Sequence, residues 1–116
     1  MEQIDAGRHL EGLLRDFPTL RAAALVSRDG VPMAARGLDD ESADTLAAMA
    51  AGICAMTRRF ADRLGEGTIR SLHADLGSDE LLLMPAMDGL VLAVLRETTG
   101  GDGAEHLRER ALRGLE

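Results

Sequence analysis

Aromatic and lysine side chains are nearly absent from this sequence of 116 residues. It has no tryptophan or tyrosine, only two phenylalanines, and no lysine, so arginine supplies all 13 of its basic side chains. With so few aromatic rings, stacking on bases or sugars is not expected as a mode of binding. The formal net charge of −7 also excludes the positive surface with which proteins bind nucleic acids or anionic membranes.

Disulfides, signal peptides and membrane spans are not expected either. Cys54 is the only cysteine, so no disulfide can form within the chain, which fits a reducing compartment. The N-terminus lacks the basic and apolar regions of a signal peptide. The longest apolar runs are about half as long as a bilayer span requires. We therefore predict one domain, residues 1–116, in a cytoplasmic protein with no membrane insertion.

A long stretch without charge, between Asp44 and Arg58, is rich in alanine, leucine and methionine. These residue types favour helices, so the stretch predicts a helix that ends near Leu64, before Gly65. One face repeats apolar residues at helical spacing and is predicted to pack on the rest of the domain. Its members are Leu46, Ala50, Ile53, Phe60 and Leu64.

The other sides of this helix are apolar too, which is typical of a helix covered on two sides. Because a chain of this length is too short to cover both, we expect a second copy to cover one of them. Gly52 costs about 1 kcal/mol relative to alanine inside a helix, and the close approach of a partner helix would account for it. The predicted dimer interface comprises Ala48, Met49, Gly52, Ala55 and Met56.

The whole chain predicts the order helix, two strands, helix, three strands, helix. Asp-Gly pairs at 29–30 and 88–89 separate short apolar runs and indicate two hairpins, with the type I′ turn that this pair favours at the first. Asp40 or Ser42 is expected to cap the central helix, and Asp102 the last one. Helices on both faces of one sheet make this a three-layer α+β domain. The expected elements are a helix at 3–16, strands at 22–27 and 31–36, the central helix, strands at 68–76, 81–87 and 90–95, and a last helix that begins near Ala104.

Residues with catalytic potential are few. Cys54 lies among alanine and isoleucine, which favours a buried packing role over a nucleophile. Ser71, His73 and Asp75 share one face of a predicted strand, but no constrained turn for a nucleophile and no oxyanion hole is evident, so we expect no hydrolase there. The histidines and glycine-rich segments match neither metal-ligand spacings nor phosphate loops. We therefore expect no catalytic residue, cofactor or metal, and a protein that is not an enzyme.

Three segments resemble a known family. Residues 25–35 (LVSRDGVPMAA) resemble the first hairpin of Roadblock/dynein-light-chain domains, residues 46–52 (LAAMAAG) their long second helix, and residues 83–95 (LMPAMDGLVLAVL) their last hairpin. The order and spacing of all three carry the resemblance, which covers residues 3–112. It implies a five-stranded antiparallel sheet between a long central helix and two terminal helices. It also implies a homodimer, or a heterodimer with a relative, joined through the long helix and the third strand.

The resemblance also implies a function. Family members regulate or scaffold small Ras-like GTPases or link cargo to dynein, and bacterial members include MglB-like partners of a polarity GTPase. We therefore expect a non-catalytic dimer that binds and modulates a small Ras-like GTPase. Two alternatives stay open: an adaptor without effect on nucleotide turnover, and a small-molecule sensor, which would need a cavity between helix and sheet.

A charged cluster follows the uncharged stretch of the central helix. It can be a docking patch for the GTPase, or even supply an arginine to the GTPase in trans. It can also be a set of cations that is favourably placed near the negative end of the helix. The candidate partner-binding residues are Arg58, Arg59, Asp62 and Arg63.

Overall fold

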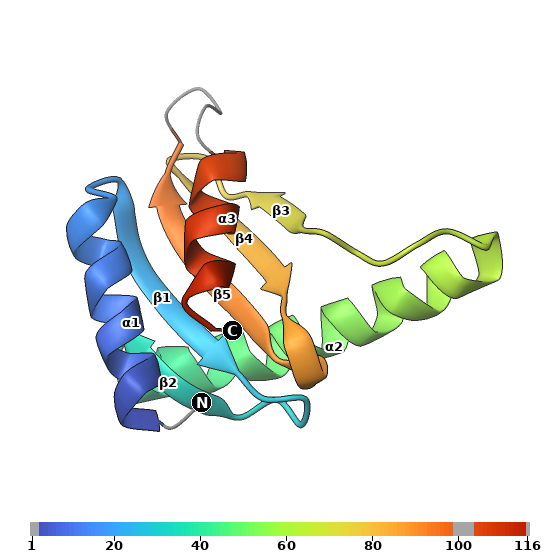
Figure 1. The fold of residues 1–116 in the computed structure, drawn as a ribbon, viewed down its shortest axis with the longest axis horizontal. Helices are drawn as coiled ribbons and strands as arrows, with labels where there is room; N and C mark the ends of the chain where they lie inside the picture. Colours follow the sequence, from blue (N-terminus) through green and yellow to red (C-terminus); the bar gives the residue numbers. More distant parts are fainter. Residues whose placement is uncertain (1–2, 99–103, 116) are drawn as a thin grey trace.

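A five-stranded antiparallel sheet lies between two layers of helices in the computed structural model, which describes residues 3–98 and 104–115 (Figure 1). The strand order is β2-β1-β5-β4-β3; α1 and α3 cover one face and α2 covers the other. The predicted three-layer α+β fold and element order are thus confirmed. The elements are α1 Gln3–Asp16, β1 Leu20–Val26, β2 Pro32–Arg36, α2 Asp40–Leu64, β3 Leu72–Asp75, β4 Asp79–Pro85, the short 3-10 helix η1 Met87–Gly89, β5 Val91–Glu97 and α3 Ala104–Arg113.

The three inner strands are apolar on both faces because helices cover both faces. Leucines of α1 and α3 pack on the large side chains of one face, among them Leu25, Leu82 and Leu92. The α2 face is lined by smaller residues, such as Ala24 and Ala93, opposite the alanines of the helix. Because the side chains are small on both the helix and the sheet, α2 lies close to the sheet and no large gap remains between them.

Capping fixes the length of α2. Asp39 precedes the helix, and its carboxylate accepts a hydrogen bond of 2.7 Å from the backbone N–H of Ser42. The capping residue is therefore Asp39 rather than the predicted Asp40 or Ser42, and Asp102, the predicted cap of α3, lies outside the described residues. Gly65 ends α2 at φ 72°, with the left-handed backbone that glycine adopts at little cost.

The face of α2 that packs on the sheet agrees with the prediction only in part: Ala50 is buried there and Leu46 packs against the same cluster. Its buried residues are Ala43, Ala47, Ala50 and Cys54, whereas Ile53, Phe60 and Leu64 are 40%, 62% and 59% exposed. The prediction that these three large side chains face the sheet is wrong. Periodicity alone finds an apolar face but does not say which of two apolar faces meets the sheet, and the sheet accepts the smaller side chains.

The second half of α2 extends beyond the sheet, and the chain returns through residues 65–71 to β3 (Figure 1). No described residue of α2 after Cys54 is buried. The third strand begins only at Leu72, four residues later than predicted, because the returning chain must first cross this distance. Before that point, Arg70 ties the chain to α3: its guanidinium donates to Glu105 at 2.7 Å, and its carbonyl oxygen accepts from Arg108 Nε at 3.1 Å.

The two Asp-Gly hairpins have different turns. In the first, Gly30 has φ 83° and its N–H donates to the carbonyl of Ser27, but Asp29 does not share the positive φ. This is a turn that ends in a left-handed glycine, not the predicted type I′ turn. In the second, Asp88 and Gly89 both have positive φ, 59° and 78°, as type I′ requires.

Candidate functional site: the outer faces of the long helix

A stripe of large apolar side chains runs along the side of α2. They recur at intervals of four, three, four and four residues, so they share one helical face. This face is distinct from the alanine face that packs on the sheet, and the exposed fractions of its side chains lie between 40% and 67%. The apolar stripe consists of Met49, Ile53, Met56, Phe60 and Leu64.

An apolar groove of about 400 Å³ continues the stripe toward the start of α2. Leu46 and Met49 form its helix wall, and Leu76, Leu81 and Leu95 form the wall on the sheet. Leu76, just after β3, is 60% exposed. The stripe and the groove share Met49 and together form one apolar surface on the side of α2 that faces β3, and contiguous exposed apolar patches mark interaction sites.

The predicted interface residues divide between two faces. Met49 and Met56 belong to the apolar stripe. Ala48, Gly52 and Ala55 lie on the adjoining face, which we call the small-residue face. A Cβ added to Gly52 would have no heavy atom within 4 Å, so this face is open at its centre.

Part of the small-residue face serves a contact within the subunit. A Cβ on Gly30, in the β1–β2 turn, would lie 3.4 Å from the Cα of Ala48 and 3.6 Å from the Cβ of Ala51. The turn therefore approaches the helix closely, and larger residues at these positions would push it away. This contact gives a second reason for small residues here besides the predicted partner helix.

The free edge of the sheet is next to the same apolar surface. β3 is the last strand of the sheet and pairs only with β4, from Leu72 opposite Leu83 to Asp75 opposite Glu80. Its outer backbone groups face away from the sheet, and a strand with such groups can pair with another chain.

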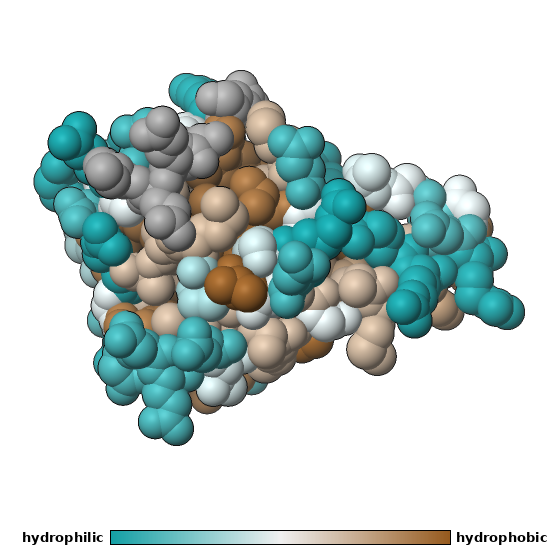
Figure 2. All heavy atoms as spheres, turned by 90° about the horizontal axis from the view of Figure 1, so that it is seen from below, coloured by the Kyte–Doolittle hydropathy of each residue, from teal (hydrophilic) through white to brown (hydrophobic). Residues whose placement is uncertain are grey.

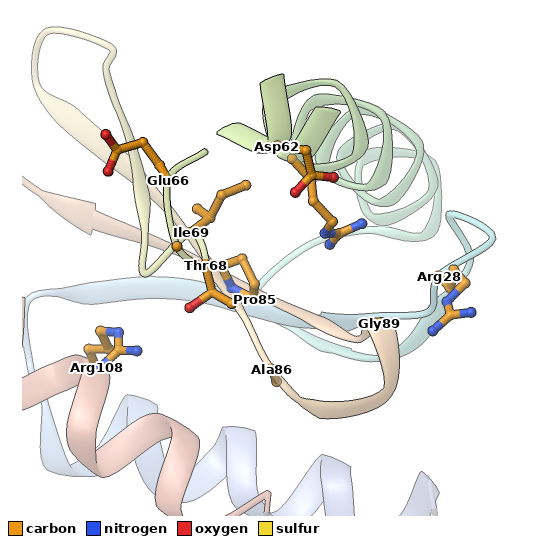
Figure 3. A pocket seen from close by; sticks show the side chains of 11 residues that line it. Arg28, Asp62, Glu66, Thr68, Ile69, Pro85, Ala86, Gly89 and Arg108 are labelled. Carbon is orange, nitrogen blue, oxygen red and sulfur yellow. The ribbon is translucent and has the colours of Figure 1, made fainter. Parts of the chain in front are cut away.

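A polar cleft of about 820 Å³ lies beneath the projecting half of α2 (Figure 3). Arg58 and Asp62 line it from the helix, and Pro85, Ala86 and Gly89 from the opposite side. Arg28 lies at one end of the cleft and Arg108 at the other. Its cationic and anionic side chains favour a polar partner surface over an apolar ligand.

The structure brings together only part of the predicted charged patch. Arg58 and Asp62 line the cleft, whereas Arg59 and Arg63 are exposed on α2 outside its lining. Arg28 joins them from the β1–β2 turn, a position that the sequence did not single out because the two segments lie far apart in the chain. Seen from below, the projecting end of the molecule is largely hydrophilic (Figure 2).

Cys54 has the properties of a packing residue. It is 1% exposed among the alanines beneath α2. Burial raises the pKa of its thiol, and Arg58 opposes this rise with a smaller effect. The thiol is therefore neutral near pH 7, while the reactive form of cysteine is the thiolate.

The described residues contain no group of three or more histidine, cysteine or acidic side chains that could hold a metal ion, and the three histidines make separate contacts. His9 meets the carbonyl of Ala111 at 2.6 Å, and His106 packs on Phe17 with ring centroids 5.6 Å apart. His73 contacts Ser71 and Glu80 instead.

In the part of the chain that the structure describes, no helix combines the length and apolar character needed to cross a membrane.

Comparison with known proteins finds a family pattern and solved structures that match this chain. Residues 8–96 match the pattern of the Roadblock/LC7 domain. A crystal structure of a Roadblock/LC7 domain from Streptomyces avermitilis is 31% identical, covering 94% of this chain and 90% of that one, with a TM-score of 0.84. None of the curated proteins matches the sequence significantly.

Two MglB structures are also similar. The gliding protein MglB from Thermus thermophilus is 27% identical, covering 97% of this chain and 86% of that one, with a TM-score of 0.80. An MglB in a tetrameric arrangement is 25% identical, covering 95% of this chain and 84% of that one, with a TM-score of 0.81. The family pattern spans most of the chain and the similar structures share its architecture, so this protein belongs to the Roadblock/LC7 family.

Proposed function

We propose that this protein is a homodimer that binds a small Ras-like GTPase and modulates its nucleotide cycle. The Roadblock/LC7 family is one of regulatory and adaptor domains. The observation that carries the proposal is the apolar surface of α2 and its groove, which lies beside the free edge of β3. A surface of this kind is costly to expose to water and is stabilised by a second copy that covers it.

A two-fold axis gives this surface a definite pairing. In a symmetric dimer the same patch serves both subunits, so residue i meets residue j and j meets i. If the stripes cross antiparallel at their middle, Ile53 meets Met56 of the partner subunit, and Met49 meets Phe60 of the partner subunit. Phe60 and Leu64, which project past the sheet in one copy, then enter the groove beside Met49 in the other.

The edge of β3 supports the same arrangement. Two β3 strands related by this axis run antiparallel and can exchange backbone hydrogen bonds, which extends the sheet across both subunits. The face with Ala48, Gly52 and Ala55 stays a prediction as part of the interface. It adjoins the stripe but points further from β3, so a dimer built on the stripe does not depend on it.

The GTPase would meet a polar surface near the projecting end of α2. Arg58, Asp62 and Arg28 line the cleft there, and Arg59 and Arg63 stand beside it. By binding one conformation of the switch segments more tightly, the dimer would shift the GTPase toward that conformation and change hydrolysis or exchange. The likeness to MglB proteins supports a partner of this class.

The test is GTP turnover by a small Ras-like GTPase encoded beside this gene, with and without this protein. We expect a change in the rate of hydrolysis or exchange, and loss of the change with Arg58→Glu. Arg8→Glu on α1, the same charge reversal at an exposed arginine outside the lining of the cleft, is the matched control and should act like the wild type.

Other outcomes point to other functions. Binding without any change in turnover would make the protein an adaptor and refute modulation. No binding at all, together with stabilisation by a metabolite, would favour a sensor. Ala47 and Ala50 pack closely on the sheet, so the ligand of such a sensor would have to occupy the apolar groove of about 400 Å³ between Leu46 and Leu76.

A further inference from the structure

The chain that returns from α2 has unpaired backbone groups along the wall of the polar cleft. Gly67, Thr68 and Ile69 line this cleft and belong to no helix or strand. No described residue forms a hydrogen bond with the backbone N–H or C=O groups of these three. The backbone of residues 67–69 is therefore free to pair with another chain, as the outer groups of an edge strand are.

β4 has a free edge at the same cleft. Its neighbour β3 begins at Leu72, opposite Leu83, whereas β4 continues to Pro85. The N–H of Leu76 donates to the carbonyl of Asp79, and every second residue of β4 directs its backbone groups to the same side. The carbonyl of Pro85 therefore points to the β3 side, where no strand accompanies this end of β4. Pro85 lines the cleft, so its carbonyl oxygen is available as an acceptor there (Figure 3).

Four charged side chains in the lining form no ion pair with any other described residue. They are the cations Arg28 and Arg58 and the anions Asp62 and Glu66. Arg108 differs, because its guanidinium is already engaged within the subunit. An occupant with one acidic and one basic side chain can pair with both kinds of charge, whereas an apolar ligand would bury them unpaired.

The lack of a side chain at Gly89 makes room for the Arg28 guanidinium. A Cβ added to Gly89 would collide with Nε of Arg28 and would lie 3.0 Å from its Nη2. The guanidinium therefore packs against the backbone of the β4–β5 turn. This packing restricts the side chain before binding, which lowers the conformational entropy lost when it pairs with a carboxylate.

A second copy that covers the apolar stripe leaves the helix side of the cleft open. Arg58 follows Met56 by two residues, and Asp62 follows Phe60 by two residues. Two residues turn an α-helix by about 200°, so the cleft and the stripe lie on opposite sides of α2. The same helix can therefore serve the dimer with one side and a further partner with the other.

We propose that the cleft binds an extended segment of the partner GTPase, whose backbone pairs with residues 67–69. This inference rests on the proposed function and adds the form and the chemistry of the bound segment. A helix satisfies its own backbone groups, whereas an extended segment needs partners, which the wall of the cleft supplies. An acidic side chain of the segment meets Arg28 or Arg58. A basic side chain of the segment meets Asp62 or Glu66.

Hydrogen exchange tests the backbone pairing. It is measured on the dimer alone and on its complex with the small GTPase encoded beside this gene. The amides of residues 67–69 should exchange freely in the dimer and should be protected in the complex, because a paired N–H exchanges only when its hydrogen bond opens. Equally fast exchange of these amides in the free and the bound dimer would overturn the proposal.

Proline substitutions at neighbouring positions test single donors. Proline removes the N–H, and successive N–H groups of an extended chain point to opposite sides. One of Thr68→Pro and Ile69→Pro, but not both, should therefore raise the Kd for the GTPase roughly 5- to 100-fold, the effect of leaving a hydrogen-bond acceptor unsatisfied. Thr68→Ala keeps the N–H and is the matched control, with the Kd of the wild type. Equal effects of the two proline variants, or none, would contradict the pairing.

Charge reversal tests the side chains of the cleft. Arg28→Glu should raise the Kd at least about 10-fold, because it places an anion opposite the acidic side chain of the segment. Arg8→Glu on α1 is the matched control and should bind like the wild type. An unchanged Kd in Arg28→Glu would refute the role assigned to Arg28. Thermal melts and sedimentation identify any variant that fails to fold or to dimerise.

The results separate this inference from the proposed function. If the wild-type dimer does not bind the GTPase, the proposed function fails and the inference fails with it. If Arg58→Glu weakens binding while both proline variants bind normally, the cleft is the docking site and only the extended segment is refuted.

Discussion

Replacing Phe60 by aspartate tests the apolar stripe most directly. The side chain is 62% exposed in the single subunit, so most of its apolar surface is available to a partner. Fully burying a phenylalanine contributes roughly 1.5–3 kcal/mol, so the exposed part contributes about 1–2 kcal/mol per copy. Two copies meet in a symmetric dimer, and Phe60→Asp should therefore raise the dissociation constant by roughly 30- to 700-fold.

Sedimentation velocity over a concentration series measures this change. The wild type should be a dimer at micromolar concentration and Phe60→Asp a monomer, with unchanged secondary structure by circular dichroism, because the residue is not part of the monomer's core. Met87→Asp is the matched control: Met87 is 49% exposed and apolar, but it lies in the β4–β5 turn. A fully dimeric Phe60→Asp variant would show that the stripe is not the interface.

Three further predictions concern neighbouring features. Ala55→Arg, on the small-residue face, should stay dimeric if the stripe forms the interface; a monomer would show by sedimentation that the interface extends to the face that the sequence predicted. Gly30→Val should lower stability by about 1–2 kcal/mol in chemical denaturation, because its φ of 83° is unfavourable for an L-residue and its Cβ would approach Ala48; an unchanged midpoint would refute this. The hydrogen bond from His73 and the pairing with Arg96 make the pKa of Glu80 lower in the folded than in the unfolded protein, so its ionised carboxylate stabilises the fold above the unfolded pKa, and this contribution is lost as pH falls through the folded pKa. Glu80→Gln should therefore weaken the fall of the melting temperature at acid pH, and an identical pH dependence of melting in the two proteins would contradict this.

The sequence predicts the fold because its signals there are local. Asp-Gly pairs, the uncharged helical stretch and the apolar strands each act over a few residues, and their order allows one three-layer arrangement. The sequence is less accurate for the type of turn at Gly30 and for the first residue of β3, since both depend on contacts with α2 and on its length. Gly30 packs on α2, and β3 can begin only after the chain returns from the projecting helix.

The candidate sites depend on contacts between distant segments, so the sequence indicates them only in part. It finds α2 as an interaction element but assigns Ile53 and Phe60 to the sheet, because two apolar faces give the same periodicity. It also groups Ser71, His73 and Asp75 by their spacing along one strand. Their actual partner, Glu80, comes from the next strand, and only the register of β3 against β4 brings it to His73.

The projection of α2 has a consequence for cooperativity. Its buried residues all lie between Ala43 and Cys54, so the following turns bury no side chain that would resist local opening. In an isolated subunit the amides from Met56 to Leu64 should exchange with deuterium far faster than those near Ala47. Contacts with a second copy would slow that exchange. For the segment from Met56 to Leu64, the association of two subunits and the last step of folding are then the same event.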